Sequence, residues 1–272
     1  MPFNKVVTSD IFIRACIEAQ GIFTSGNRSY DSLVAPGATS VRRPKLPKLV
    51  VKKNTGTAAD SDDRKGTKAD TIMVETSLNT YAVPIKDEIA AQFESNKKLV
   101  NDFAQAAKTT LEREWDKDFI AAAMATTNII QTAASGTLTW KDLIKISQKF
   151  RTLEVPRDGM IMVVSAALED QLMDIDVIKN AASYNTQILS TGKLINVNGF
   201  EIFVSGLVPK TTVNNKDCVV GIHGPGLASI ISNTGEIKEA WDGVNLQDNL
   251  DFVAHAGFEL DGAEFAVVLE LK

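Results

Sequence analysis

Few residues of the chain have the chemical types and spacing that catalysis requires. Cys16 and Cys218 lie too far apart in the 272-residue sequence to form a metal-binding pair or a disulfide framework. The two histidines, His223 and His255, lie in strand-like segments, and His255 alternates with alanines as a packing residue does. Cys218 also lacks the glycine-rich turn that presents a nucleophile. We therefore predict no catalytic thiol and no metal site.

Two short motifs resemble chemical sites more closely. The sequence GIHGPG, residues 221–226, is glycine-rich like a phosphate-binding loop, but it lacks Walker spacing and its proline removes a backbone N–H that a phosphate would need. The sequence EREWDKD, residues 112–118, carries four carboxylates, which a helix would distribute around its circumference. We predict a tight turn and a solvated helix face. No set of residues matches an active site, so neither an enzyme nor a cofactor is expected.

The composition is that of an ordinary globular protein, with 44% hydrophobic and 23% charged residues. The formal charge is −5, whereas domains that bind nucleic acid are normally basic. Charged residues interrupt residues 1–23, which argues against a signal peptide. No apolar run reaches the roughly 18 residues that a membrane-spanning helix needs. We expect a soluble protein that does not cross a membrane.

A long β projection is predicted near the N-terminus. Residues 31–53 contain three of the eight prolines, which favour extended or edge-strand structure. Residues 54–70 are small, polar or charged, as in a loop tip, and residues 72–78 alternate as a strand does. We interpret residues 31–82 as one two-stranded projection. Because an isolated hairpin is only marginally stable, a neighbouring molecule is expected to order it.

A very long helix is predicted after the projection. In the stretch VPIKDEIAAQFESNKKLV, Pro84 suits a first helical turn, and the pair Asp87-Glu88 places negative charge at the positive end of the helix. Apolar residues then recur at helical spacing over 85–124, a length of about 60 Å if the helix is unbroken. A wider step across residues 95–97 is compatible with a kink or a break. No second helix of matching length is predicted, so the apolar stripe should pack on strands or shorter elements.

The remaining elements are short. A helix over residues 9–20 should need a surface to lie against. The predicted later elements are a helix from TLTWKDLIKISQKFRTL, capped by Thr137 or Thr139, a buried strand from GMIMVVS, a short helix from SAALEDQLMDI, a hairpin turning at Asn198-Gly199, three strand-like pieces (DCVVGIHG, GLASIIS and GEIKEAW), and a last hairpin turning at Asp261-Gly262.

The basic run on the projection has two interpretations. The first is a solvated strand face, because charged residues commonly protect edge strands. Alternatively, its positive side chains contact acidic residues at the loop tip of a neighbouring copy. The residues of this predicted intersubunit contact are Arg42, Arg43, Lys45, Lys48, Lys52, Lys53, Asp60, Asp62 and Asp63.

The order of these elements resembles the major capsid proteins of tailed bacteriophages, which have the Hong Kong 97-type fold. The resemblance extends from about residue 9 to residue 272. Three loose motifs carry it: the proline-plus-acid helix start (Pro84, Asp87, Glu88), the strand-Ser-helix step (Val163, Val164, Ser165), and the hairpin NGFEIFVSGLVP.

The resemblance implies an α+β fold with an N-terminal arm (1–30), an extended β-hairpin loop (31–82), a peripheral domain with a spine helix (83–135), an axial domain (136–244) and C-terminal strands of the peripheral domain (245–272). It implies a loop near 210–216 that faces the centre of a ring of copies.

The resemblance also implies a function. The chain is expected to assemble with itself, through pentamers and hexamers, into an icosahedral shell in the host cytoplasm. That shell would become the virion head around double-stranded DNA, without sequence-specific binding. Scaffolding, portal and decoration proteins are the expected partners.

Two features differ from some members of that family. Some carry an N-terminal scaffolding segment of about a hundred residues; here either a separate scaffold exists or the segment has been removed. Some cross-link a loop lysine, and Lys65 and Lys68 lie in the predicted tip without a motif that assigns the reaction. An encapsulin, a bacterial compartment that packages a cargo protein, is the alternative within the same fold. An enzyme or adhesin that uses the long helix as a stalk is a third class.

Overall fold

The computed structural model describes residues 14, 21–35, 38–44, 73–86, 97–133, 136–176, 178, 193–212, 214–232, 236–242 and 247–272. Its elements, in chain order, are η1 (Ile22–Ser25), η2 (Asp31–Leu33), β1 (Ser40–Pro44), β2 (Met73–Ser77), β3 (Asn79–Lys86), α3 (Lys97–Met124), β4 (Ile129–Gln131), α4 (Trp140–Thr152), β5 (Met160–Ser165), η5 (Ala166–Leu168), α5 (Glu169–Met173), β6 (Lys193–Val197), β7 (Phe200–Ser205), β8 (Cys218–His223), η6 (Gly224–Gly226), β9 (Leu227–Ile231), β10 (Glu236–Asp242), β11 (Gln247–Leu260), η7 (Ala263–Phe265) and β12 (Ala266–Glu270).

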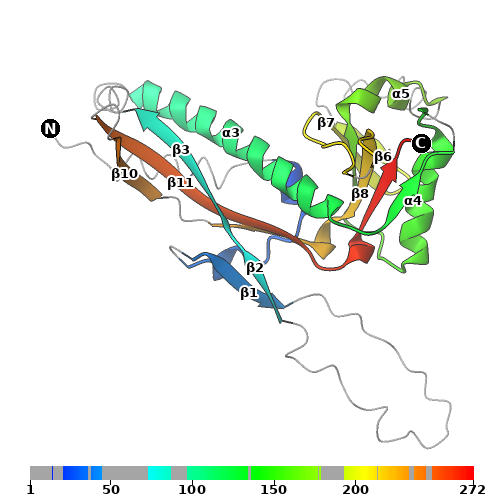
Figure 1. The fold of residues 1–272 in the computed structure, drawn as a ribbon, viewed down its shortest axis with the longest axis horizontal. Coiled ribbons are helices and arrows are strands. Elements are labelled where there is room, and N and C mark those ends of the chain that lie inside the picture. Colours follow the sequence, from blue (N-terminus) through cyan, green and yellow to red (C-terminus); the bar gives the residue numbers. More distant parts are fainter. Residues whose placement is uncertain are drawn as a thin grey trace, which may run out of the picture.

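The molecule is elongated, and its elements divide between two ends (Figure 1). At one end the long helix α3 runs beside the long strands β3 and β11. At the other end α4 and α5 lie beside a compact sheet that includes β5, β7 and β8. The short pair β1–β2 lies below this body in the view of Figure 1.

Two larger sheets form the framework. The four-stranded sheet has the order β10-β11-β3, and β9 pairs with the far part of β11. All of its pairings are antiparallel. The six-stranded sheet has the order β4-β12-β8-β5-β7-β6, with parallel pairing between β12 and β4 and between β5 and β7. The prediction of a mixed helix-and-sheet chain is confirmed.

The six-stranded sheet is buried on both faces. Ile161 and Val163 of β5 belong to the core cluster that includes α3, whereas Met160, Met162 and Val164 belong to the cluster that includes α4. Successive strand residues point to opposite faces, so a strand covered on both sides needs a continuous apolar run. This explains the sequence MIMVV and confirms the predicted buried strand.

The long helix packs on strands, as the sequence predicts. Ala107, Leu111, Trp115 and Phe119 of the predicted stripe are all buried. They share a core cluster with residues of β8, β11 and β12. The helix has 28 residues, a length of about 42 Å, whereas α4 has 13. Among the described helices, none therefore matches α3 in length.

The predicted start of the long helix is wrong. Pro84 lies in β3, opposite Asp251 of β11, and the strand continues to Lys86. The physical reason is the position of β3 at the edge of its sheet, where proline is tolerated because one side of the strand has no ladder partner. The strand also runs past the predicted boundary of the projection at residue 82. Asp87, Glu88 and the predicted break at 95–96 lie outside the described residues.

Local turn signals succeeded in one hairpin and failed in another. Asn198 and Gly199 have φ values of 54° and 90°, as a type I′ turn requires, and they join the antiparallel strands β6 and β7. Asp261-Gly262 is not a hairpin turn, because β11 and β12 belong to different sheets. The Asp261 N–H donates instead to the Gly226 carbonyl at 2.9 Å.

Two further predictions concern α4 and the N-terminal segment. Thr139 precedes α4, and its N–H donates to the Asp142 carboxylate at 3.1 Å, which confirms one of the two predicted caps. Strand β4 was not predicted. Of the predicted helix over 9–20, only Arg14 is described, and it is helical.

Candidate intersubunit surface

The base of the projection is a two-stranded antiparallel sheet. Arg42 lies opposite Glu75 and Arg43 opposite Val74 in the β1–β2 pairing. Because adjacent strand residues point to opposite faces, the two arginines have different environments. Arg42 is exposed, whereas Arg43 is 0% exposed. The predicted two-stranded form is confirmed for these residues.

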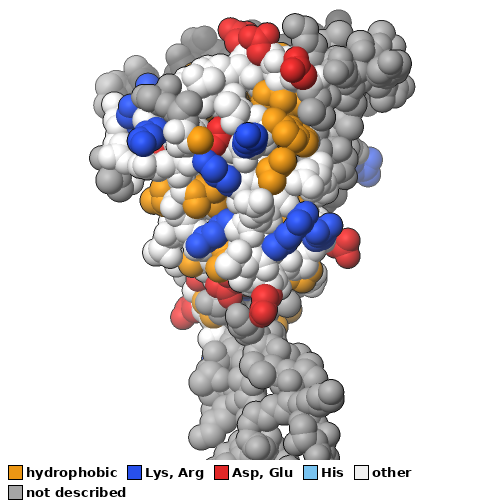
Figure 2. All heavy atoms as spheres, turned by 90° about the vertical axis from the view of Figure 1, so that its right-hand side faces the viewer, with side chains coloured by type: hydrophobic (Ala, Val, Ile, Leu, Met, Phe, Trp, Pro, Cys, Tyr) orange, Lys and Arg blue, Asp and Glu red, His pale blue; other side chains and the backbone are white. Residues whose placement is uncertain are grey.

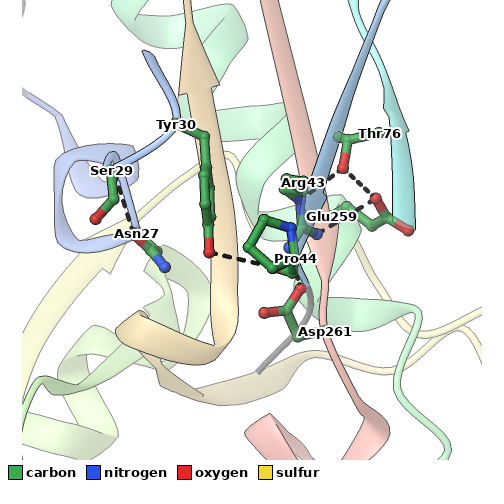
Figure 3. A network of polar contacts seen from close by, with 8 residues as sticks. All are labelled: Asn27, Ser29, Tyr30, Arg43, Pro44, Thr76, Glu259 and Asp261. Carbon is green, nitrogen blue, oxygen red and sulfur yellow. Dashed lines mark hydrogen bonds and ion pairs between the residues drawn. The ribbon is translucent and has the colours of Figure 1, made fainter. Parts of the chain in front are cut away.

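Arg43 ties β1 to the body of the protein through a buried polar network (Figure 3). Its Nη1 lies 2.5 Å from Asp261 Oδ1, and its Nη2 lies 3.3 Å from Glu259 Oε2. Its Nε donates to Thr76 Oγ1 at 2.7 Å, and Thr76 donates in turn to Glu259. A buried guanidinium is tolerated only when several donors find partners, and this network supplies them from β2 and from the end of β11.

Tyr30 closes the other side of the network. Its ring lies 5.7 Å from the Arg43 guanidinium carbon, a distance suited to a cation–π contact. Its hydroxyl donates to the Pro44 carbonyl at 3.1 Å. The segment before β1 therefore also helps to hold the arginine.

Apolar contacts support the same junction. Val41 and Leu78 are buried in a small cluster with Ala228 and Ile230 of β9. The expectation that a neighbouring molecule orders the projection is therefore wrong at its base, which packs on its own chain. The reason is that β1 and the β2–β3 junction lie against β9, which the sequence alone did not place there.

The predicted contact residues now separate into three groups. Arg43 is unavailable to a neighbouring copy, because it is buried and paired within its own chain; that prediction is wrong. Arg42 is exposed and is free to serve as predicted. The other seven predicted residues lie outside the described part of the chain: Lys45, Lys48, Lys52, Lys53, Asp60, Asp62 and Asp63.

The acidic residues of α3 hold neighbouring segments rather than forming a wholly solvated face. Asp116 accepts the Phe23 N–H at 2.9 Å, and burial raises the pKa of Asp116 to about 6. Asp118 accepts the Tyr81 hydroxyl at 2.5 Å. Glu114, paired with Lys117 at 3.1 Å on the surface, behaves as predicted. The sequence missed these roles because the partners are distant in the chain.

The residues considered for catalysis are buried or hold contacts within the fold. Burial raises the pKa of the Cys218 thiol to about 12, so it carries almost no thiolate at neutral pH. His223 is buried and stacks on Phe265 at 5.5 Å. His255 Nδ1 lies 3.1 Å from Thr80 Oγ1. The GIHGPG motif is the predicted tight turn, η6, between β8 and β9.

A shallow groove of about 440 Å³ lies between β2 and α3. Glu75, Asp118 and Glu259 line it, with Phe258 among its apolar residues. Each carboxylate already accepts a hydrogen bond, from Ser40, Tyr81 and Thr76 respectively. Within the part of the chain that the structure describes, no cluster of three metal-ligating side chains occurs, and no helix is long and apolar enough to cross a membrane.

Comparisons with known proteins agree with a shell protein. No curated protein matches this sequence. The capsid of Ralstonia phage GP4 has a similar fold, with a TM-score of 0.64 and 8% identity over 94% of this chain and 92% of that one. A protein of Mycobacterium phage Che8 gives a TM-score of 0.61 and 18% identity over 92% and 91%. A virus-like particle from Pyrococcus furiosus gives 0.53 and 12% over 97% and 98%.

The similar structures show the fold, whereas a comparison of the sequence with family models shows the family. A family model described as phage capsid protein matches residues 52–269, which is most of the chain. The resemblance to phage major capsid proteins is thereby confirmed. The chain belongs to this family of phage capsid proteins.

Proposed function

We propose that this chain is the major capsid protein of a tailed phage, and that copies of it assemble through pentamers and hexamers into the icosahedral head. The observation that carries the proposal is the match to the phage capsid family over residues 52–269. The elongated form of the subunit supports it, since a shell tile needs long edges for its neighbours (Figure 1).

The proposed division of the subunit follows the expected domains. Residues 1–30 serve as an arm and 31–82 as a loop over a neighbour, with the base of that loop clamped by Arg43. The peripheral domain combines 83–135 with 245–272, and the axial domain comprises 136–244. The sheets cross these bounds, because β9 and β10 pair with β11 and because β4 and β12 belong to the six-stranded sheet. The loop near 210–216 faces the centre of each ring of copies.

The proposed content of the shell is double-stranded DNA, held without sequence-specific binding. The net charge of −5 supports this, because each neutralised phosphate adds affinity through counterion release. A shell that must also release its genome gains from weak contacts. Scaffolding, portal and decoration proteins are the proposed partners, and assembly would take place in the host cytoplasm.

A second candidate is an encapsulin-type compartment that encloses a cargo protein. The similarity to the Pyrococcus furiosus virus-like particle supports this candidate, because it extends over nearly the whole of both chains. The two candidates share the fold and differ in what the shell contains.

Electron microscopy of the expressed protein tests the proposal. We expect closed particles or rings, either from the chain alone or together with a scaffold from the same gene neighbourhood. Nuclease-protected DNA in particles from the native source supports the phage head, whereas an enclosed enzyme supports the compartment. A chain that stays monomeric at all salt and protein concentrations, with scaffold present, contradicts both.

A further inference from the structure

Helix α4 exposes more positive charge than its one acid balances. Lys141 and Arg151 are exposed, and Lys145 and Lys149 are partly exposed. Its one acid, Asp142, is buried and already paired with Lys145 at 2.8 Å. No ion pair to Lys141, Lys149 or Arg151 occurs within the described chain. Lys141, Lys145 and Lys149 share one side of the helix, and we call these three residues the cationic face; Arg151 lies on the other flank.

The spacing of the lysines is unfavourable for the isolated subunit. Lys141, Lys145 and Lys149 follow one another at intervals of four, so they are neighbours along one side of the helix, and like charges at this spacing destabilise a helix by a few tenths of a kcal/mol per pair. Because these lysines destabilise their own helix, we infer that they serve a function other than folding, such as contact with another molecule.

Apolar side chains lie among these charges. Ile144 of α4 is half-buried, and Ile129 of the edge strand β4 is 46% exposed. The two elements adjoin, because Lys145 Nζ donates to the Gln131 carbonyl at 3.3 Å. Figure 2 shows Lys and Arg side chains across the middle of this end of the molecule, between hydrophobic ones. Apolar residues with a charged surround are typical of a protein interface.

The short helix α5 and the residues after it carry the opposite charge. Glu169, Asp170, Asp174 and Asp176 are all exposed, and this segment contains no base. We call these four residues the anionic face. In Figure 2 acidic side chains gather at the top of the same end, where Figure 1 places α5.

The two faces are neighbours on one side of the six-stranded sheet. Gln171 of α5 accepts the Leu138 N–H at 2.7 Å and donates to the Gly136 carbonyl at 3.1 Å, just before α4 begins. Both helices contribute to one core cluster. No ion pair joins the two faces among the residues that the structure describes, so each is available to another molecule.

We propose that the cationic face of one copy binds the anionic face of the next copy in a ring. A two-fold dimer centred on α4 would oppose the cationic faces, and like charges disfavour it. A two-fold dimer centred between the two faces would pair opposite charges, so a wild type that stops at dimers in native mass spectrometry would contradict the ring contact. A head-to-tail arrangement pairs opposite charges at every contact, and such a contact closes into a ring when the rotation permits. The inference rests on the proposed function and specifies which surfaces build its pentamers and hexamers.

A charge exchange tests the contact. K141E/K149E reverses the cationic face, D170K/D174K reverses the anionic face, and the four-residue exchange restores complementarity. K141R/K149R is the matched control that keeps the charge. Native mass spectrometry reports rings and electron microscopy reports shells, while circular dichroism confirms that each variant is folded. A reversal that unfolds the protein is replaced by K141Q/K149Q.

We expect each reversal to raise the concentration needed for ring formation by about tenfold or more, and the exchange to bring it back toward wild type. Ring formation by the wild type should weaken with added salt.

Equal assembly of all variants, or reversals that the exchange does not rescue, would overturn this contact and leave the proposed function standing. Wild-type rings that never close into a shell would count against the proposed function, whereas their sensitivity to the reversals would support the contact. A strictly monomeric wild type overturns both.

Discussion

Arg43 Nη1 and Asp261 Oδ1 lie 2.5 Å apart inside the protein, although 218 residues separate them in the chain. The contact joins the first strand of the projection to the end of β11. A buried charge depends on its partner, since leaving one member alone in the interior costs far more than an exposed pair contributes. The arginine therefore decides how firmly the projection is attached.

Replacing Arg43 by methionine should reduce the free energy of unfolding by about 3–5 kcal/mol, because Asp261 would remain buried without its cation. Chemical denaturation measures the loss. Arg42→Met is the matched control, since it changes the exposed neighbour and should alter stability by less than about 0.5 kcal/mol. R43M/D261N should recover part of the loss; equal effects of R42M and R43M would contradict the buried assignment.

Trp115 permits a test of the packing between α3 and the N-terminal segment. It is fully buried, and its ring meets Phe23 and Tyr81 edge-on at 5.4 and 6.2 Å. Trp115→Ala should cost about 3–5 kcal/mol of unfolding free energy. Trp115→Phe should cost less than half as much, because the Trp115 Nε1 has no hydrogen-bond partner among the described residues to lose. Similar costs for the two variants would contradict this packing.

Asp116 should make stability depend on pH. Its folded pKa of about 6 lies above the ordinary value of 3.8 because burial disfavours the charged form. The folded state therefore binds more protons between about pH 4 and pH 6, so the contribution of Asp116 to stability is full below this window and is lost as the pH rises through 6.

Asp116→Asn removes this titration and keeps an acceptor for the Phe23 N–H. We expect the stability of D116N, relative to the wild type, to be greatest above pH 7 and to fall as the pH drops toward 4. Thermal or chemical unfolding across this range measures the difference. A difference that does not change with pH would contradict the raised pKa.

Gly199 tests the turn between β6 and β7. Its φ of 90° lies in the region that side chains disfavour, so Gly199→Ala should cost about 1–2 kcal/mol of unfolding free energy. Gly206→Ala is the control, because a Cβ there meets open space and no positive φ is present. Equal effects of the two substitutions would contradict the type I′ turn.

The remaining basic residues of the projection test the intersubunit contact proposed for them. R42E/K45E/K48E should leave the subunit folded and weaken assembly, and the buried Arg43 is kept so that folding is not affected. Sedimentation of assembled particles and circular dichroism measure the two properties. R42K, which preserves charge, is the control. Normal assembly of the triple variant would show that these residues form only a solvated face.

Local patterns predicted those parts of the fold that local physics decides. Thr139, one of two predicted caps, marked the start of α4, Asn198-Gly199 marked a turn, and the helical spacing of apolar residues identified the buried side of α3. In each case the interacting residues lie within a few positions of one another, so the sequence displays the interaction directly.

The errors arose where distant segments meet. Pro84 matches a helix start as well as an edge strand, and only its pairing opposite Asp251 distinguishes the two. Asp261 matches a turn residue as well as a buried partner of Arg43. The basic run displayed two neighbouring arginines, but the face that each occupies depended on where β9 and β11 lie. Charge and propensity alone do not contain that information.

Three connections join the two large sheets: α3, η6 and η7. The last two touch each other, through the hydrogen bond from Asp261 to Gly226 and the stacking of His223 on Phe265. Gly224 fits there because a side chain would overlap the Ser25 carbonyl oxygen. Bending one sheet against the other would have to break the contacts between η6 and η7 and distort α3 at the same time. We therefore expect the subunit to move as one rigid unit. A closed shell made from it would take its curvature from the angles at the contacts between subunits.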